Sequence, residues 1–257
     1  KLLIDWTKKS GGIFTGLVIP NVFGPFGNPY YNSVVATFSH QLTHNEKPKI
    51  DLDGRLKLIY VGELINEIYR VILDAKGCPE LKLDYTSEIK VSELLEKLNS
   101  YKDQYLNNGA IPELNTTFEK NLFNTYRSYI DYKSFFPYNL KQHVDDRGTF
   151  VEIIRTLSSG QVSSSTTKPG LTRGNHFHTR KIERFTVIKG KALIRIRRIG
   201  TNNILDFKLD GDKPAFVDMP IWYTHNITNI GSDDLYTQFW TNEFYDSSKS
   251  DTYFEKV

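Results

Sequence analysis

Two histidines, His176 and His178, stand two residues apart in the segment 170–190. Because successive side chains of a strand point to opposite faces, both imidazoles lie on one face if this segment is extended. Glu183 follows after a short turn, and a third histidine, His225, lies further along the chain. Three imidazoles and one carboxylate are a ligand set for zinc, iron, manganese or nickel. The pattern predicts a metal site, and the ligand types alone do not select the metal.

The same half of the chain has the pattern of a β-sandwich or barrel. From about residue 149, short runs of β-branched and aromatic residues recur with turn residues between them. Many short strands at even spacing are typical of these folds. The expected strands are 150–155, 160–166, 184–188, 192–198, 204–209, 215–218 and 235–240.

The first half has a mixed pattern of strands and helices. Residues 13–19 form a nearly continuous apolar run, which predicts a strand buried on both faces of a parallel sheet. Residues 61–75 repeat apolar side chains every 3.6 residues and predict a helix. Residues 91–107 and 117–130 are further helix candidates. The fold class expected is therefore α+β.

We place the domain boundary where the last expected helix gives way to an aromatic and proline-containing stretch. The two predicted domains are residues 1–132 and residues 133–257. No internal repeat or low-complexity segment divides the chain further.

The spacing of the metal-site residues is that of a known family. The pattern Gly-x5-His-x-His-x4-Glu-x6-Gly over residues 170–190 resembles the first cupin motif at every position. The segment 220–229 resembles the second, Pro-x-Gly-x2-His-x3-Asn, except that Trp222 replaces the glycine. The resemblance implies an all-β jelly-roll barrel that holds a metal, for which we expect zinc, on the four predicted ligands. Trp222 would supply an apolar wall for a sugar. The alternative is that the histidines are ordinary core residues and the glutamate a surface residue. It would require four residues of ligand type to occur at these spacings by coincidence.

Two further stretches resemble the deoxysugar 3,5-epimerases that act on dTDP-4-keto sugars. They are Asp-Asp-Arg-Gly-Thr-Phe-Val-Glu at 145–152 and Arg-Gly-Asn-His at 173–176. The resemblance implies that Arg147 and Arg173 hold the nucleotide diphosphate, which suits the planar guanidinium fork. It also implies that His176 is the general base. Those epimerases need no metal, so His176 has two competing roles here, ligand and base, and Arg147 has the alternative of an ordinary turn residue.

The first half resembles the C-terminal portion of extended short-chain dehydrogenases/reductases that act on nucleotide sugars. The matching stretches are 17–25, 32–38 and 58–63. In that family the residue matching Asn21 contacts the sugar diphosphate. Joined to a cupin, the chain resembles bifunctional capsular-polysaccharide enzymes. In these a cupin is assigned C3 epimerisation and a reductase the NADPH-dependent C4 reduction.

The resemblance to the reductases does not extend to the half of their fold that binds the cofactor. No Gly-x-x-Gly-x-x-Gly or Gly-x-Gly-x-x-Gly turn occurs near the start of the chain. The family's Tyr-x-x-x-Lys pair would precede residue 1. We therefore expect that this polypeptide neither binds NADP nor reduces a substrate. Apolar side chains of the expected sheet, Ile13, Leu17 and Ile19, would need cover, so we expect a homodimer.

Composition excludes several classes of protein. No apolar run approaches the roughly 18 residues of a membrane span, so we expect no membrane insertion. The formal charge is +3 with scattered basic residues, which gives no footprint for nucleic acid. One cysteine, Cys78, without an export signal favours a reducing cytoplasm.

These observations lead to an isomerase hypothesis. We expect C3 epimerisation of a UDP-4-keto-6-deoxy-N-acetylhexosamine, since the proton beside a ketone can be removed when the enolate is stabilised. Tyr223 and Lys181 are the candidate acid and base, because each is placed near the predicted ligands. The alternatives are a non-catalytic module that binds nucleotide sugars, and oxygen-dependent cleavage at an iron cupin.

Overall fold

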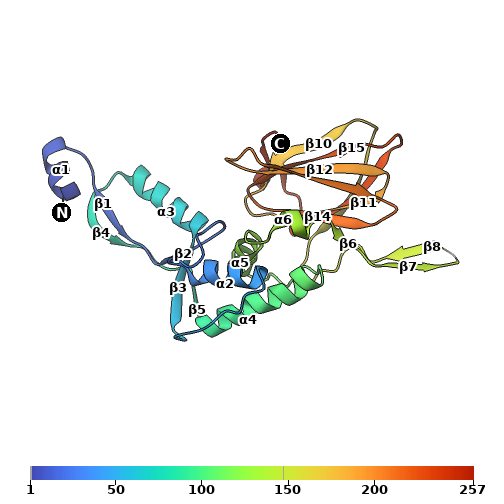
Figure 1. The fold of residues 1–257 in the computed structure, drawn as a ribbon. Helices are drawn as coiled ribbons and strands as arrows, with labels where there is room; N and C mark the ends of the chain where they lie inside the picture. The colour runs from blue at the N-terminus through green and yellow to red at the C-terminus, as the bar shows by residue number, and fades with distance from the viewer. Residues whose placement is uncertain (1, 147) are drawn as a thin grey trace. The chain divides into compact units, whose positions relative to one another are not determined.

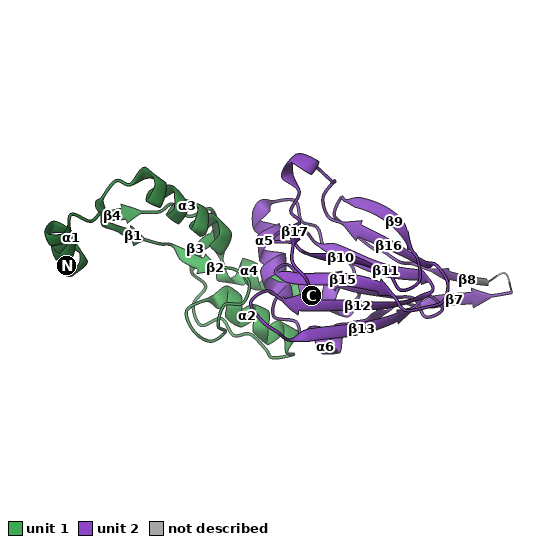
Figure 2. Cartoon of the chain, turned by 90° about the horizontal axis from the view of Figure 1, so that it is seen from above, with its two compact units in different colours: residues 1–99 green, residues 100–257 purple. Residues whose placement is uncertain are grey.

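The computed structural model describes residues 2–146 and 148–257 and divides into two compact units, residues 1–99 and 100–257 (Figure 2). The expected boundary between residues 132 and 133 lies inside the second unit. Among the described residues, no helix has both the length and the apolar character needed to cross a membrane.

The first unit combines short strands with helices (Figure 1). Its elements are α1 (Leu2–Ser10), β1 (Thr15–Val18), β2 (Asn21–Phe23), α2 (Val34–Thr43), β3 (Arg55–Tyr60), α3 (Val61–Asp74), β4 (Cys78–Lys82), β5 (Ser87–Lys90) and α4 (Val91–Tyr101), whose last residues belong to the second unit. Strand β2 pairs in parallel with β3, which pairs antiparallel with β5. Strands β1 and β4 form a separate parallel pair.

The apolar run 13–19 does not form one strand buried on both faces, so that prediction is wrong. Strand β1 ends at Val18, and the chain continues into β2 at Asn21. Because β1 has a single neighbouring strand, its side chains are only partly covered. Ile13 and Ile19 are 60% and 41% exposed, whereas Leu17 is half-buried. Cover for these side chains by a second copy stays a prediction.

Helix α3 forms where the sequence predicts a helix, whereas α2 was not predicted. Helix α3 occupies nearly all of the predicted range 61–75, and the Glu63 carboxylate accepts the backbone N–H of Tyr60 at 3.1 Å in a capping box. Ser33 caps α2 by accepting the N–H of Ala36 at 3.3 Å. Each cap satisfies backbone donors that have no partner inside the helix.

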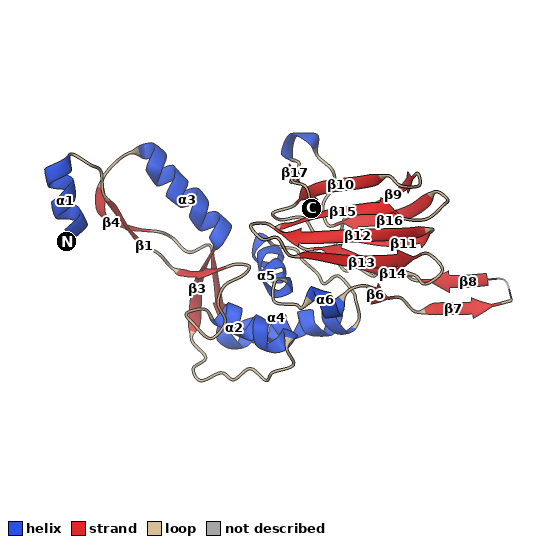
Figure 3. Ribbon diagram, turned by 45° about the horizontal axis from the view of Figure 1, so that its top comes forward, coloured by secondary structure: helices blue, strands red, loops and turns tan. Residues whose placement is uncertain are grey.

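The second unit is dominated by antiparallel strands (Figure 3). Its strands are β6 (Tyr138–Asn139), β7 (Gln142–Asp145), β8 (Gly148–Val151), β9 (Gln161–Thr167), β10 (Thr172–Phe177), β11 (Glu183–Lys189), β12 (Lys191–Arg198), β13 (Ile204–Asp210), β14 (Ala215–Met219), β15 (Tyr223–Asn229), β16 (Leu235–Thr241) and β17 (Tyr253–Phe254). Two five-stranded sheets have the orders β13-β12-β15-β10-β17 and β6-β14-β11-β16-β9, and β7 and β8 form a hairpin. This two-sheet architecture confirms the all-β prediction for the second half of the chain.

The core of the second unit lies between the two sheets. In β12, Ile194 and Ile196 are fully buried, while Arg195 between them is exposed, as alternation along a strand requires. Val187 of β11 and Trp240 of β16 contribute buried side chains from the other sheet. The sheets thus hold their inward residues in fixed positions, which places the polar side chains discussed below.

Helices before the barrel belong to the barrel unit. They are the π-helix η1 (Lys102–Asn107), α5 (Thr117–Arg127) and α6 (Tyr132–Phe135), while a 3-10 turn, η2 (Ser247–Lys249), precedes β17. The Tyr105 hydroxyl of η1 donates to Asp218 at 2.7 Å, and Arg184 pairs with the same carboxylate at 2.7 Å. All three side chains are almost completely buried. These contacts, which leave no local trace in sequence, explain why the unit starts near residue 100 and not at 133.

Candidate metal centre

Four side chains from three strands and one loop meet inside the second unit. His176 lies in β10, His178 directly after it, Glu183 at the start of β11, and His225 in β15. Their ligand atoms all lie within 4.8 Å of one another, and the group can hold a metal ion. Strands β10 and β15 are paired with His176 opposite His225. Glu183 belongs to the other sheet, so the cluster joins both sheets of the unit.

Glu183 is the centre of the cluster. One of its carboxylate oxygens, Oε2, lies 3.1 Å from Nε2 of His178 and 3.3 Å from Nε2 of His225. His225 is fully buried, and its Nε2 has no hydrogen-bond partner. Leaving a buried polar atom unsatisfied is costly, whereas a metal bound to that nitrogen would satisfy it. The donor set of imidazole and carboxylate also suits a divalent transition metal, so the residues fit the predicted group.

The electrostatics of the cluster favour deprotonated ligands at two positions. Burial, together with the neighbouring His225 and His178, lowers the pKa of His176 to about 4. Burial by itself would raise the pKa of Glu183, but the hydrogen bond with His178 and the nearby His225 imidazole hold that pKa well below its usual range. His176 is therefore neutral and Glu183 charged at neutral pH, the states in which each binds a metal.

His178 differs because both of its ring nitrogens face acceptors. Burial alone would lower its pKa, but Glu183 and Asp251 outweigh burial and raise it. Nδ1 donates to the backbone carbonyl of Asp251, and Nε2 faces Glu183. Without a metal, this arrangement suits an imidazolium that donates from both nitrogens.

A cavity of about 220 Å³ opens beside the cluster. It is lined by Gln161, Ser163, His176, His178, Lys181, Glu183, Phe239, Thr241, Glu243, Tyr245 and Thr252. Lys181, one of the predicted catalytic residues, is buried in this lining. Sequence reasoning missed Glu243 and Tyr245, because they come from the segment after β16 and carry no recognisable spacing relative to the histidines.

The other predicted site residues lie elsewhere. The ring of Tyr223 packs edge-on against Tyr132 at 5.5 Å and does not line the cavity. Trp222 likewise lies outside the lining, with its ring stacked on Phe177 at 5.7 Å. The expectation that Trp222 forms a wall of this cavity therefore finds no support in the geometry, because its side chain turns to the neighbouring strand.

Of the predicted phosphate-binding residues, Asn21 belongs to the first unit and Arg173 to the second. Arg173 donates to Thr167 Oγ1 and to the Thr166 carbonyl, both at 3.0 Å, so its guanidinium is engaged with the end of β9. Asn21 lines a pocket of about 190 Å³ in the first unit. Arg147 lies outside the described residues.

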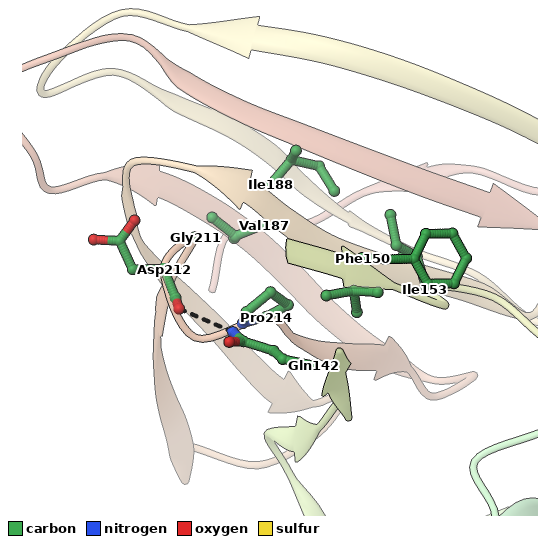
Figure 4. A pocket seen from close by; sticks show the side chains of 9 residues that line it. Gln142, Phe150, Ile153, Val187, Ile188, Gly211, Asp212 and Pro214 are labelled. Atoms are coloured by element: carbon green, nitrogen blue, oxygen red, sulfur yellow. Dashed lines mark hydrogen bonds between the residues drawn. The ribbon is translucent and has the colours of Figure 1, made fainter. Parts of the chain in front are cut away.

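A larger cavity, of about 530 Å³, lies beside the β7–β8 hairpin (Figure 4). Phe150, Val187, Ile188 and Pro214 give it an apolar lining, and Gln142 donates to the Asp212 carbonyl at 3.0 Å across its edge. Among the described residues that line it, Asp212 is the one with a titratable side chain. Cavity size therefore does not identify the candidate site of this unit, because the histidine and glutamate side chains line the smaller cavity.

Comparison with known proteins finds that most of the second unit is similar to a domain of polysaccharide biosynthesis. Residues 143–253 match the Polysaccharide biosynthesis C-terminal domain family, and this range contains all four cluster residues. The chain is 35% identical over 238 residues to the UDP-2-acetamido-2,6-beta-L-arabino-hexul-4-ose reductase of Pseudomonas aeruginosa, covering 91% of this chain and 63% of that protein. The chain thus spans less than two thirds of the length of this relative.

Solved structures narrow the class to one family. The crystal structure of the capsular polysaccharide assembling protein CapF from Staphylococcus aureus is 38% identical, with a TM-score of 0.53, over 100% of this chain and 70% of that one. A structure of CapF with the inhibitor 3-isopropenyl-tropolone matches with 38% identity and the same TM-score, over 100% of this chain and 75% of that one. The chain belongs to the CapF family.

Proposed function

We propose that the second unit epimerises C3 of a UDP-4-keto-6-deoxy-N-acetylhexosamine in the synthesis of a capsular or surface polysaccharide sugar. The observation that carries the proposal is the buried cluster of three histidines and one glutamate beside a cavity. The Pseudomonas relative is named for a UDP-linked 2-acetamido sugar with a carbonyl at C4. A hydrogen on C3 of such a sugar is next to that carbonyl and is acidic enough for enzymatic removal.

The proposed roles follow from which groups reach the cavity. His176, His178, Glu183 and His225 would hold a divalent metal, for which we propose zinc. A metal at this position supplies a Lewis acid that polarises the keto oxygen. Lys181 and Tyr245 line the same cavity and offer an amine and a phenol for removing and returning the proton. Inversion needs proton carriers on opposite faces of C3, which one group cannot supply.

The rest of the chain is assigned by resemblance. We propose that the first unit is the substrate-side portion of a short-chain dehydrogenase/reductase fold, in which Asn21 contacts the sugar diphosphate. Arg147 and Arg173 remain proposed diphosphate ligands, and use of Arg173 would require release from Thr167 and Thr166. We also propose that the polypeptide acts in the cytoplasm as a homodimer and binds no NADP.

Deuterium incorporation tests the proposed reaction. The zinc-loaded protein is incubated with UDP-4-keto-6-deoxy-N-acetylhexosamine in deuterated water, and NMR follows the C3 position. We expect deuterium to enter at C3 with the natural sequence and to be lost in His225→Ala, which removes a buried ligand. His143→Ala is the matched control, because it removes an exposed imidazole outside the cluster.

Each outcome of this experiment has a defined meaning. Absence of exchange with metal bound would overturn the isomerase proposal and leave a module that binds nucleotide sugars. Exchange that survives removal of the metal would move His176 from ligand to general base. Exchange that depends on iron and oxygen, with cleavage of the sugar, would point to a different cupin reaction.

A further inference from the structure

Asp251 lies near the end of the chain and is completely buried. Its carboxylate accepts the backbone N–H groups of Thr179, Arg180 and Lys181 at 3.0, 2.8 and 2.9 Å, and the Thr179 hydroxyl at 2.6 Å. Residues 179–181 belong to the loop that joins β10 to β11, between the ligands His178 and Glu183. One side chain from the C-terminal segment therefore fixes the backbone between two predicted metal ligands.

The backbone of Asp251 contacts the cluster directly. Its carbonyl oxygen accepts a hydrogen bond from Nδ1 of His178. A carbonyl can only accept, so the proton of this bond must reside on Nδ1. Nε2, which faces Glu183 at 3.1 Å, is then the nitrogen whose lone pair is left for a metal. A hydrogen bond to the second ring nitrogen is the usual device that orients a metal-binding histidine.

The position of Asp251 is itself fixed by strand pairing. Directly after it, β17 adds to the edge of β10, with Phe254 opposite His176 and Tyr253 opposite Phe177. The N–H of Glu255 also donates to the Asn175 carbonyl at 3.0 Å. The C-terminal segment is thus tied to β10, the strand that carries His176 and leads into the loop 179–181.

We propose that Asp251 is a positioning residue of the metal centre, which holds the loop 179–181 through its carboxylate and the tautomer of His178 through its carbonyl. The proposal rests on the metal site of the proposed function and does not depend on the reaction. It also places the backbone of Lys181, since the N–H of that residue is one of the four donors.

Metal affinity measures this role without an assay of activity. In Asp251→Ala, three buried N–H groups lose their acceptor, so the loop is free to move and His178 is no longer oriented. We expect the zinc affinity, measured by competition with a chromophoric chelator, to fall about 10-fold to 100-fold, as for other partners of ligating histidines. Asp246→Ala is the control. The Asp246 carboxylate lies in the same segment and accepts the backbone N–H of Ser248 at 2.9 Å, without contacting the loop 179–181.

A second variant keeps the test valid if Asp251→Ala does not fold. Asp251→Asn retains one acceptor oxygen and places an amide N–H₂ where the carboxylate accepted a donor, so we expect a smaller loss of zinc affinity. Nitrogen-15 NMR of the metal-free protein, at a pH where the His178 ring is neutral, gives the tautomer independently, with the proton on Nδ1 in the natural sequence and a mixture of tautomers in the variant. Zinc affinity and tautomer that both equal those of the natural sequence in a folded variant would overturn the proposal. A protein that binds zinc but exchanges no deuterium would defeat the proposed reaction and leave this inference intact.

Discussion

At the scale of single residues, His178 shows how the hydrogen-bond partners of the cluster set its protonation. Its two ring nitrogens face a carbonyl and a carboxylate, and its pKa is raised by these acceptors despite burial. His176, a few ångströms away, has its pKa lowered to about 4 by burial. In the metal-free state these two histidines therefore differ in charge, because His176 is neutral whereas His178 retains its proton more strongly.

Zinc binding should therefore release a proton from His178. A raised pKa means that the imidazole holds its proton into the neutral range, and the metal must displace that proton from Nε2. Affinity for zinc should then rise with pH until the pH passes the raised pKa of His178, and level off above it. Isothermal titration in two buffers of different ionisation enthalpy counts the protons released. Equal heats in both buffers would contradict this prediction.

The backbone conformation of Trp222 is a second feature at the scale of single residues. It stands where the cupin motif has glycine, and its backbone adopts φ of +62°, in the left-handed region that favours glycine. Its N–H donates to the His178 carbonyl at 2.8 Å, and its carbonyl accepts from Ile199 at 2.9 Å, so neighbours hold this conformation. The stacking of its ring on Phe177 offsets part of the strain.

A pair of variants separates the ring from the backbone. Trp222→Gly and Trp222→Ala both remove the stacked ring, but only glycine relieves the left-handed strain. We expect Trp222→Gly to be more stable than Trp222→Ala by about 1 kcal/mol, the usual cost of this conformation for a residue with Cβ. Urea unfolding of the two variants gives this difference, and a value near zero or of opposite sign would show that the backbone at 222 is unstrained or relaxes.

At the scale of elements, the metal cluster depends on pairings that are distant in sequence. Strand β10 lies between β15 and β17, so His176 is placed by residues about 50 and about 80 positions further along the chain. The pairing of the short strand β17 with β10 holds the nearby Asp251 against the loop after β10. A motif search sees the ligands, whereas the elements that orient them are identified only by pairing.

At the scale of the whole molecule, the division into units is set by buried polar contacts. Asp218 of β14 accepts from Tyr105 and from Arg184, and the Arg184 guanidinium also lies 3.5 Å from the centre of the Phe216 ring. Asn124 of α5 donates to the Arg180 carbonyl at 2.9 Å, next to the metal loop. Helices of the segment before the barrel thus complete its polar interior.

Two fragments test this division. A fragment of residues 100–257 keeps the helices that supply Tyr105 and Asn124. One of residues 133–257 deprives Asp218 of the Tyr105 hydroxyl and Arg184 of the Gly109 carbonyl. We expect the longer fragment to unfold cooperatively and to bind zinc. The shorter one should lose several kcal/mol or fail to fold, because buried charged partners become unsatisfied. Thermal unfolding followed by circular dichroism compares them, and equal melting temperatures would show that the barrel starts at 133.

The sequence by itself determined which four residues form the cluster, the all-β second half and the helices at 61–75, 91–107 and 117–130, because each rests on local spacing or periodicity. Only the tertiary structure decided the unit boundary, the partial exposure of the run at 13–19, and the separation of Tyr223 and Trp222 from the cavity. It alone brought Glu243, Tyr245 and Asp251 to the site. The reason is physical: spacing reports which side chains share a face, whereas burial, strand partners and hydrogen-bond acceptors come from segments far away along the chain.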